Sequence, residues 1–108
     1  MLLEDKIILV SGGTRGLGAG IARAAAADGA AGIMITGRDE SAGKALAAEL
    51  TGNGTEAIFH AVDLADPLSA ADSVRATVSN YGRLDCVVNS AGITTRGTLL
   101  DTTVELFD

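Results

Sequence analysis

Short apolar runs alternate along this chain with longer stretches in which apolar residues recur at helical spacing. The apolar runs, each of four to six residues, are Lys6–Val10, Ile33–Thr36, Ala57–Val62 and Leu84–Val88. Their aliphatic and β-branched content predicts strands that are buried on both faces of a parallel sheet. The intervening stretches 16–27, 40–50 and 66–80 predict three helices.

The third helix has the clearest start signal. Asp66 is expected as its N-cap, with Pro67 in the first helical position, where the missing N–H of proline costs nothing. Its inward residues are expected to be Ala71, Val74 and Val78, because they lie three and four positions apart.

Strands and helices in strict alternation predict an α/β fold. Right-handed crossovers between parallel strands lead to an open, doubly wound sheet of the Rossmann type, with strand order 3-2-1-4. The fourth strand then lies at an edge, which we expect a further parallel strand or another copy of the chain to cover. A helix is expected from Leu100 to the end of the chain, because Thr102 and Glu105 have capping-box spacing.

The first strand is followed at once by the glycine-rich segment SGGTRGLG, residues 11–18. Gly12 permits a sharp turn, Gly16 lets backbone N–H groups approach a pyrophosphate, and Gly18 allows the next helix to pack closely on the sheet. The N-terminus of that helix is a phosphate-binding position. The segment lacks the Lys and the spacing of a kinase-type phosphate loop. It therefore predicts a dinucleotide site, the alternative being a glycine-rich turn that binds nothing.

This loop resembles the TGxxxGxG motif of the short-chain dehydrogenase/reductase family, with Ser11 in place of Thr. Val62-Asp63-Leu64 resembles that family's acidic turn after the third strand, and Asn89-Ser90-Ala91-Gly92 resembles its NNAG motif after the fourth. The resemblance covers all 108 residues. It implies an oxidoreductase that transfers a hydride between a nicotinamide dinucleotide and a carbonyl or alcohol substrate.

The expected cofactor-binding residues follow the strand ends. They are Ser11, Gly12, Thr14, Arg15, Gly16, Leu17 and Gly18 in the loop, Gly37 and Arg38 after the second strand, Asp63 and Leu64 after the third, and Asn89, Ala91 and Gly92 after the fourth. The resemblance implies that Asp63, with the backbone of Leu64, binds the adenine; the alternative is that Asp63 only shapes its turn. It also implies that Asn89 braces the neighbouring loop.

The end of the second strand bears on the choice of dinucleotide. About 20 residues after the glycine loop, a carboxylate would bind the ribose 2′-hydroxyl and select NAD. This sequence has Gly37 and Arg38 there, so a 2′-phosphate would meet no acid and would meet a guanidinium that can bind it. Arg15 is a second candidate cation, while Asp39 and Glu40 are expected at the start of the second helix. The sequence therefore favours NADP over NAD.

The catalytic residues that the resemblance requires are not found in this sequence. That family uses a Tyr and a Lys in a YxxxK motif, but Tyr81 is the only Tyr and Asp85 occupies the Lys position. No catalytic residue is therefore assigned, and residues 1–108 are expected to be the cofactor-binding half of a longer protein. Two functions stay open: part of an NADP-dependent oxidoreductase, or a non-catalytic dinucleotide-binding module.

Composition excludes several other classes of protein. Eight basic and 14 acidic side chains give a net charge of −6, which argues against nucleic acid as a partner. One Cys and one His exclude an internal disulfide and a metal site of clustered Cys or His ligands. No apolar run approaches the roughly 18 residues that span a membrane, and no signal-peptide pattern is present. We expect a cytoplasmic protein that acts on a small molecule and is a homo-oligomer at full length.

Overall fold

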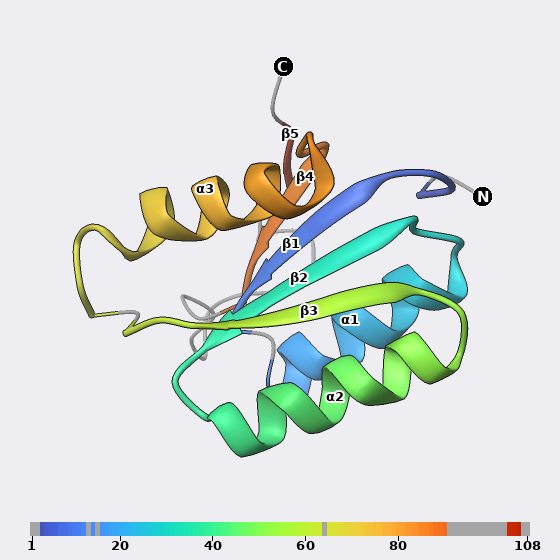
Figure 1. Ribbon diagram of the computed structural model, residues 1–108, viewed down its shortest axis with the longest axis horizontal. Helices are drawn as coiled ribbons and strands as arrows, with labels where there is room; N and C mark the ends of the chain where they lie inside the picture. Colours follow the sequence, from blue (N-terminus) through green and yellow to red (C-terminus); the bar gives the residue numbers. More distant parts are fainter. Residues whose placement is uncertain (1–2, 13, 15, 64, 91–103, 107–108) are drawn as a thin grey trace.

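The computed structural model describes residues 3–12, 14, 16–63, 65–90 and 104–106. The strands are β1 (Ile7–Ser11), β2 (Gly32–Gly37), β3 (Glu56–Ala61), β4 (Cys86–Asn89) and β5 (Val104–Leu106). The helices are α1 (Gly16–Ala27), α2 (Glu40–Gly52) and α3 (Ser69–Tyr81). Helices α1 and α2 cover one face of the sheet and α3 lies on the other, so the chain forms three layers (Figure 1).

The sheet has the order β3-β2-β1-β4-β5, and its first four strands are parallel. The expected doubly wound arrangement with strand order 3-2-1-4 is therefore confirmed. The register brings Ser11 of β1 opposite Thr36 of β2 and Asn89 of β4, while Thr36 lies opposite His60 of β3. These four polar residues form one row across the sheet near the carboxyl ends of its parallel strands.

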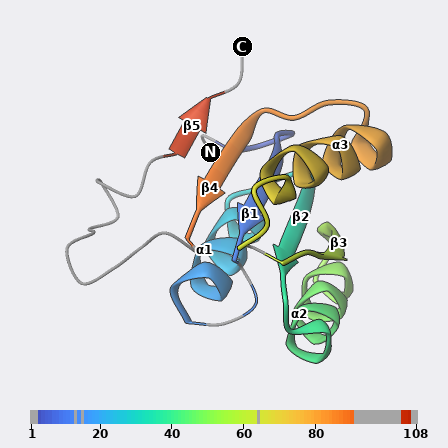
Figure 2. The ribbon, with the colours of Figure 1, turned by 90° about the vertical axis from the view of Figure 1, so that its left-hand side faces the viewer.

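The outer edge of β4 differs from the expectation. Val104–Leu106 form a short strand that pairs antiparallel with β4, so the helix expected from Leu100 onward is wrong for these residues (Figure 2). Residues 100–103 lie outside the described part of the chain. The unpaired N–H and C=O groups of β4 favour strand pairing by any extended segment that reaches them. Residues of the same chain, Val104–Leu106, thus pair along the edge that β4 was expected to present to another strand or copy.

The face of the sheet under α1 and α2 holds an aliphatic core. Its members from the strands are Ile8, Val10, Ile33, Ile35, Cys86 and Val88, and those from the helices are Ala19, Ala22, Ala25, Leu46, Ala47 and Leu50. Small alanines let α1 approach the strands closely, as the aromatic content of only 3% leads one to expect. Helix α2 begins as predicted, because the Asp39 side chain accepts a hydrogen bond from the Ala42 N–H at 3.0 Å.

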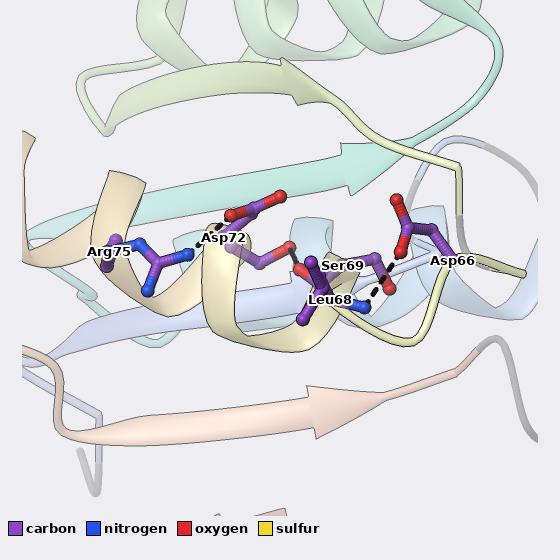
Figure 3. A network of polar contacts seen from close by, with 6 residues as sticks. Asp66, Leu68, Ser69, Asp72 and Arg75 are labelled. Carbon is purple, nitrogen blue, oxygen red and sulfur yellow. Dashed lines mark hydrogen bonds and ion pairs between the residues drawn. The ribbon is translucent and has the colours of Figure 1, made fainter.

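Helix α3 begins later than the sequence predicts. Asp66 is not its N-cap, because the helix starts at Ser69 and the cap position is occupied by Leu68. The Asp66 carboxylate accepts a hydrogen bond from the Leu68 N–H at 2.9 Å, and its carbonyl accepts one from the Ser69 N–H at 3.0 Å. These bonds close a turn of their own ahead of the helix, beside the exposed Asp72–Arg75 ion pair (Figure 3).

The face that α3 presents to the sheet is also different from the prediction. Its buried residues are Ser69, Ser73 and Thr77, whereas Ala71 and Val78 are exposed and Val74 is only half-buried. The Ser73 hydroxyl donates to the Ser69 carbonyl and the Thr77 hydroxyl to the Ser73 carbonyl, both at 2.8 Å. Because these hydroxyls are satisfied within the helix, they can be buried at little cost.

Tyr81 explains why α3 turns this way. Its hydroxyl lies 3.1 Å from the Ile33 carbonyl and 2.9 Å from the Glu56 carbonyl, so it bridges β2 and β3. A Cβ at Gly32 would come within 2.4 Å of the Tyr81 ring, which shows how closely the ring lies on β2. This anchor at the last turn fixes the rotation of α3 and directs the small hydroxyl residues inward.

Candidate functional site

The carboxyl ends of the parallel strands collect most of the predicted cofactor-binding residues at one edge of the sheet. Ser11 and Asn89 end β1 and β4, Gly37 ends β2, and Asp63 lies two residues beyond β3. In a doubly wound sheet, ligands bind at this edge, where the crossovers diverge to opposite faces. The divergence lies between β1, which leads to α1, and β4, which follows α3.

The glycine loop leaves β1 through a turn that only glycine adopts easily. Gly12 has φ of 77°, in the left-handed region, and its N–H donates to the Thr36 carbonyl at 2.8 Å. Gly16 opens α1 with φ of 54°, and a Cβ there would meet nothing within 4 Å. The first turn of α1 contains no acidic residue. Among the described residues, nothing fills the space over Gly16 and no acidic side chain lies in the first turn, which suits an anion at the helix N-terminus.

Ser90 fastens this loop from the other side, a role that the sequence did not indicate. Its hydroxyl lies 2.7 Å from the Ser11 carbonyl and 3.0 Å from the Gly12 carbonyl, and its N–H donates to the Ser11 carbonyl at 3.0 Å. The turn at Gly12 is thus held by β2 through one bond and by the end of β4 through another. The available sequence signal was a hydroxyl residue directly after a strand, which by itself is common.

Gly37 and Thr14 lie against each other. Gly37 is buried at the end of β2, and a Cβ built on it would come within 2.9 Å of the Thr14 methyl group. Arg38 follows immediately and is exposed, while Asp39 and Glu40 are occupied at the start of α2 as expected. This corner of the site therefore has the Arg38 guanidinium on its surface, and position 37 carries no carboxylate.

Asp63 takes part in its own turn. One carboxylate oxygen accepts a hydrogen bond from the Ala65 N–H at 3.0 Å, and the Asp63 carbonyl accepts one from the Asp66 N–H at 2.9 Å. The side chain borders a groove of about 610 Å³ between β3 and α3, which also takes in His60 and Ser69. The two hydrogen bonds therefore support the turn-shaping role of Asp63.

Two predicted residues of the first helical turn differ in environment. Gly18 is buried where α1 meets the sheet, and Leu17 is 44% exposed beside it. Four predicted residues, Arg15, Leu64, Ala91 and Gly92, lie outside the described part of the chain.

Neither Tyr81 nor Cys86 lies at this edge, because Tyr81 contacts the amino ends of β2 and β3 and Cys86 begins β4. Burial raises the pKa of Tyr81 to about 12, and its hydroxyl is engaged with two strand carbonyls. Burial also raises the pKa of the Cys86 thiol, which lies in β4 on the core face. No group of three or more His, Cys, Asp or Glu side chains in the described ranges could hold a metal ion. Nor is any helix there long and apolar enough to cross a membrane.

Comparison with known proteins identifies the class of this fold and site. A family model described as short chain dehydrogenase matches residues 6–108, and the chain belongs to that family. It is 38% identical to versicolorin reductase 1 of Aspergillus parasiticus over 106 residues, which cover 98% of this chain and 40% of the relative. It is 40% identical to L-fucose dehydrogenase of Bos taurus over 87 residues, covering 81% of this chain and 30% of the relative.

Solved structures agree with this assignment. A short chain dehydrogenase from Burkholderia cenocepacia J2315 in complex with NADP is 40% identical, with a TM-score of 0.79 over 94% of this chain and 41% of that chain. A blue fluorescent protein from a metagenomic library in complex with NADPH is 38% identical, with a TM-score of 0.79 over 95% of this chain and 42% of that chain. The chain thus spans about two fifths of the length of these proteins.

Proposed function

We propose that this chain is the NADP(H)-binding part of an oxidoreductase that transfers a hydride between NADP(H) and a carbonyl or alcohol substrate. The observation that carries the choice of dinucleotide is the end of β2, where Gly37 is buried and Arg38 is exposed. A carboxylate that would select NAD is lacking at that position, and a guanidinium can pair with a 2′-phosphate. Relatives that bind NADP and NADPH support the proposal.

The pyrophosphate would lie at the N-terminus of α1. The open space over Gly16, the tethered turn at Gly12 and the lack of an acidic residue in the first turn fit such a group. Thr14 and Leu17 would border it, and Gly18 would hold the helix close to the sheet. Arg15 would add positive charge, and Ser11 and Asn89 would brace the loop from the strand ends.

The adenine would lie near the turn after β3. There the Asp63 carboxylate would accept a hydrogen bond from its amino group through the oxygen that does not bind Ala65, and the Leu64 backbone would complete the contact. Ala91 and Gly92 would leave room for the riboses. When bound, the nicotinamide supplies the hydride chemistry; the chain's own residues bind and orient the dinucleotide. The proton carrier is assigned to residues outside this chain.

The wider setting follows from the same proposal. The substrate is a small molecule with a carbonyl or hydroxyl group, and the protein acts in the cytoplasm as a homo-oligomer. The alternative is a dinucleotide-binding module without catalysis. Oxidation of NADPH by a panel of carbonyl compounds, with the full-length protein, distinguishes the two: turnover supports the oxidoreductase, and tight binding without turnover supports the module.

Arg38→Ala tests the choice of dinucleotide directly. We expect NADPH binding to weaken by about 10- to 100-fold, because a charge-assisted contact contributes about 1.5–3 kcal/mol, while NADH binding changes little. Fluorescence titration of both cofactors measures this. Arg23→Ala is the matched control, because that arginine forms an exposed ion pair with Glu49 between α1 and α2. Equal losses for NADPH and NADH would contradict the assignment of the 2′-phosphate to Arg38.

Gly16→Val tests the phosphate position. We expect it to abolish dinucleotide binding, because a side chain would fill the space over the helix N-terminus. Gly54→Val is a control for a valine at a positive-φ glycine, because Gly54 has φ of 98° and open space around its Cβ, but lies in the turn before β3. If both variants keep full affinity for NADPH in calorimetry, the phosphates do not lie over Gly16.

A further inference from the structure

The end of β2 is fixed in space from two sides. Gly37 lies opposite Ala61 of β3 in the parallel ladder, and its carbonyl accepts a hydrogen bond from the Val62 N–H at 2.9 Å. One residue earlier, the Thr36 carbonyl accepts a bond from the Gly12 N–H. The backbone at Gly37 therefore cannot move to make room for a side chain without breaking sheet contacts.

Thr14 fills the space that a side chain at position 37 would need. Its methyl carbon would lie 2.9 Å from a Cβ on Gly37, its hydroxyl oxygen 3.6 Å and its own Cβ 3.9 Å. Of the three staggered positions of the Thr14 side chain, two place a heavy atom, either the methyl or the hydroxyl, in this space. Truncation of Thr14 to Ala would leave only the contact at 3.9 Å, which is ordinary van der Waals distance.

We propose that Thr14 is a specificity-determining residue of the nucleotide site, which acts by excluding any side chain from position 37. A side chain at position 37 would have to displace Thr14 before its carboxylate could bind a ribose 2′-hydroxyl. The loop after β1 and the end of β2 therefore exclude the NAD-selecting residue together. This inference rests on the proposed function for its meaning in cofactor choice, but its steric part can be tested without any cofactor.

The steric part is tested by a melting cycle on the full-length protein without cofactor. We expect Gly37→Ala to lower the melting temperature by about 2–8 °C, the range for local overpacking in domains of this size. Thr14→Ala combined with Gly37→Ala should recover most of that loss. Gly20→Ala is the control, because a Cβ at Gly20 meets nothing within 4 Å. An unchanged melting temperature for Gly37→Ala, or no recovery in the double variant, overturns the proposal.

The specificity part is tested by titration with NADP and NAD. We expect Gly37→Asp alone to lose at least about 10-fold in NADP affinity and to gain less than about 3-fold for NAD. Adding Thr14→Ala should then raise NAD affinity about 10-fold above Gly37→Asp. If Gly37→Asp alone gains NAD as strongly as the double variant, Thr14 is not a determinant and the proposal is wrong.

Failure of this inference can be told apart from failure of the proposed function. If the wild-type protein binds neither dinucleotide, the proposed function is wrong, while the melting cycle still reports the contact between Thr14 and position 37. If Gly37→Asp does not fold but the double variant does, that rescue supports the steric exclusion. If neither folds, the melting cycle with Gly37→Ala decides the question.

Discussion

The helices on the two faces of the sheet contribute different kinds of buried side chain. Under α1 and α2, the strands present Ile33, Ile35 and their neighbours to alanines and leucines, and the core is aliphatic throughout. Under α3, Met34 shares the face with the buried Thr36, and the helix contributes Ser69, Ser73 and Thr77. The same strands thus support an aliphatic layer on one side, and on the other a layer in which Ile7, Leu9 and Met34 lie together with these hydroxyl residues.

The difference shows that burial on this sheet does not require apolar side chains, provided that hydroxyl groups are satisfied locally. Ser73 and Thr77 donate to carbonyls of their own helix, one turn earlier. By contrast, the Thr36 hydroxyl oxygen is the one buried side-chain polar atom in the described ranges without a hydrogen-bond partner. The α3 face therefore contains buried hydroxyl groups that have a hydrogen-bond partner and one that does not.

The largest expected effect contrasts an aliphatic residue on each side. Ile35→Ala should lower the free energy of unfolding by about 2–5 kcal/mol, because Ile35 is fully buried and the change leaves a cavity. Val78→Ala on α3 should cost less than about 0.5 kcal/mol, because Val78 is 44% exposed. Urea unfolding measures both. Similar losses at the two positions would mean that α3 has a covered apolar face in solution.

Added methyl groups should show that the two layers are equally tight. A Cβ at Gly43 of α2 would come within 2.2 Å of the Phe59 ring, and one at Gly32 of β2 within 2.4 Å of the Tyr81 ring. We expect each change to Ala to cost about 1–3 kcal/mol. Thermal melting measures the loss. A neutral result at Gly32 alone would reveal a looser α3 layer.

Thr36→Val should raise the free energy of unfolding by about 1 kcal/mol, because it removes a buried hydroxyl that lacks a partner. Thr77→Val is the matched comparison, since it removes a hydroxyl that has one, and it should be neutral or destabilising by up to about 1 kcal/mol. Chemical denaturation of both variants tests the distinction. Equal effects would indicate that Thr36 has a partner, such as a bound water.

The smallest expected effect concerns the hydrogen bond of Asp85, which belongs to neither helix layer. The Asp85 carboxylate accepts a hydrogen bond from the Ile7 N–H at 2.7 Å, and this bond, with Arg83, holds the pKa of Asp85 below its ordinary value of 3.8. A depressed folded-state pKa contributes stability above the ordinary value, which is lost as the pH falls through the folded-state value. Asp85→Asn should therefore flatten the acidic end of the stability profile, measured by urea unfolding at several pH values. An unchanged profile would remove Asp85 from the acid response.

Much of this protein could be predicted from local sequence. Apolar runs placed β1 to β4 within one or two residues, and the glycines after β1 located the left-handed turn that leads into α1. Both predictions succeeded because strand burial and left-handed turns depend on residues close together in the chain. The predictions failed for α3 and for Val104–Leu106. Helical spacing favoured Val74 and Val78 as buried residues of α3, and capping-box spacing favoured a helix where β5 lies. Neither pattern contains information about distant neighbours.

The sequence alone determined the order of elements, the strand order, the position of the glycine loop and the lack of an acid at Gly37. Tertiary structure decided the rotation of α3, through the bridge from Tyr81 to two strands, and the pairing of β5 with β4. It also decided the contact of Thr14 with Gly37 and the tether from Ser90 to the glycine loop. The side-chain contacts join residues at least 23 positions apart, and the paired residues of β4 and β5 are at least 16 positions apart. Hydrophobic periodicity describes which side of an element is apolar, but the choice among faces of similar size depends on contacts that form only when distant segments meet.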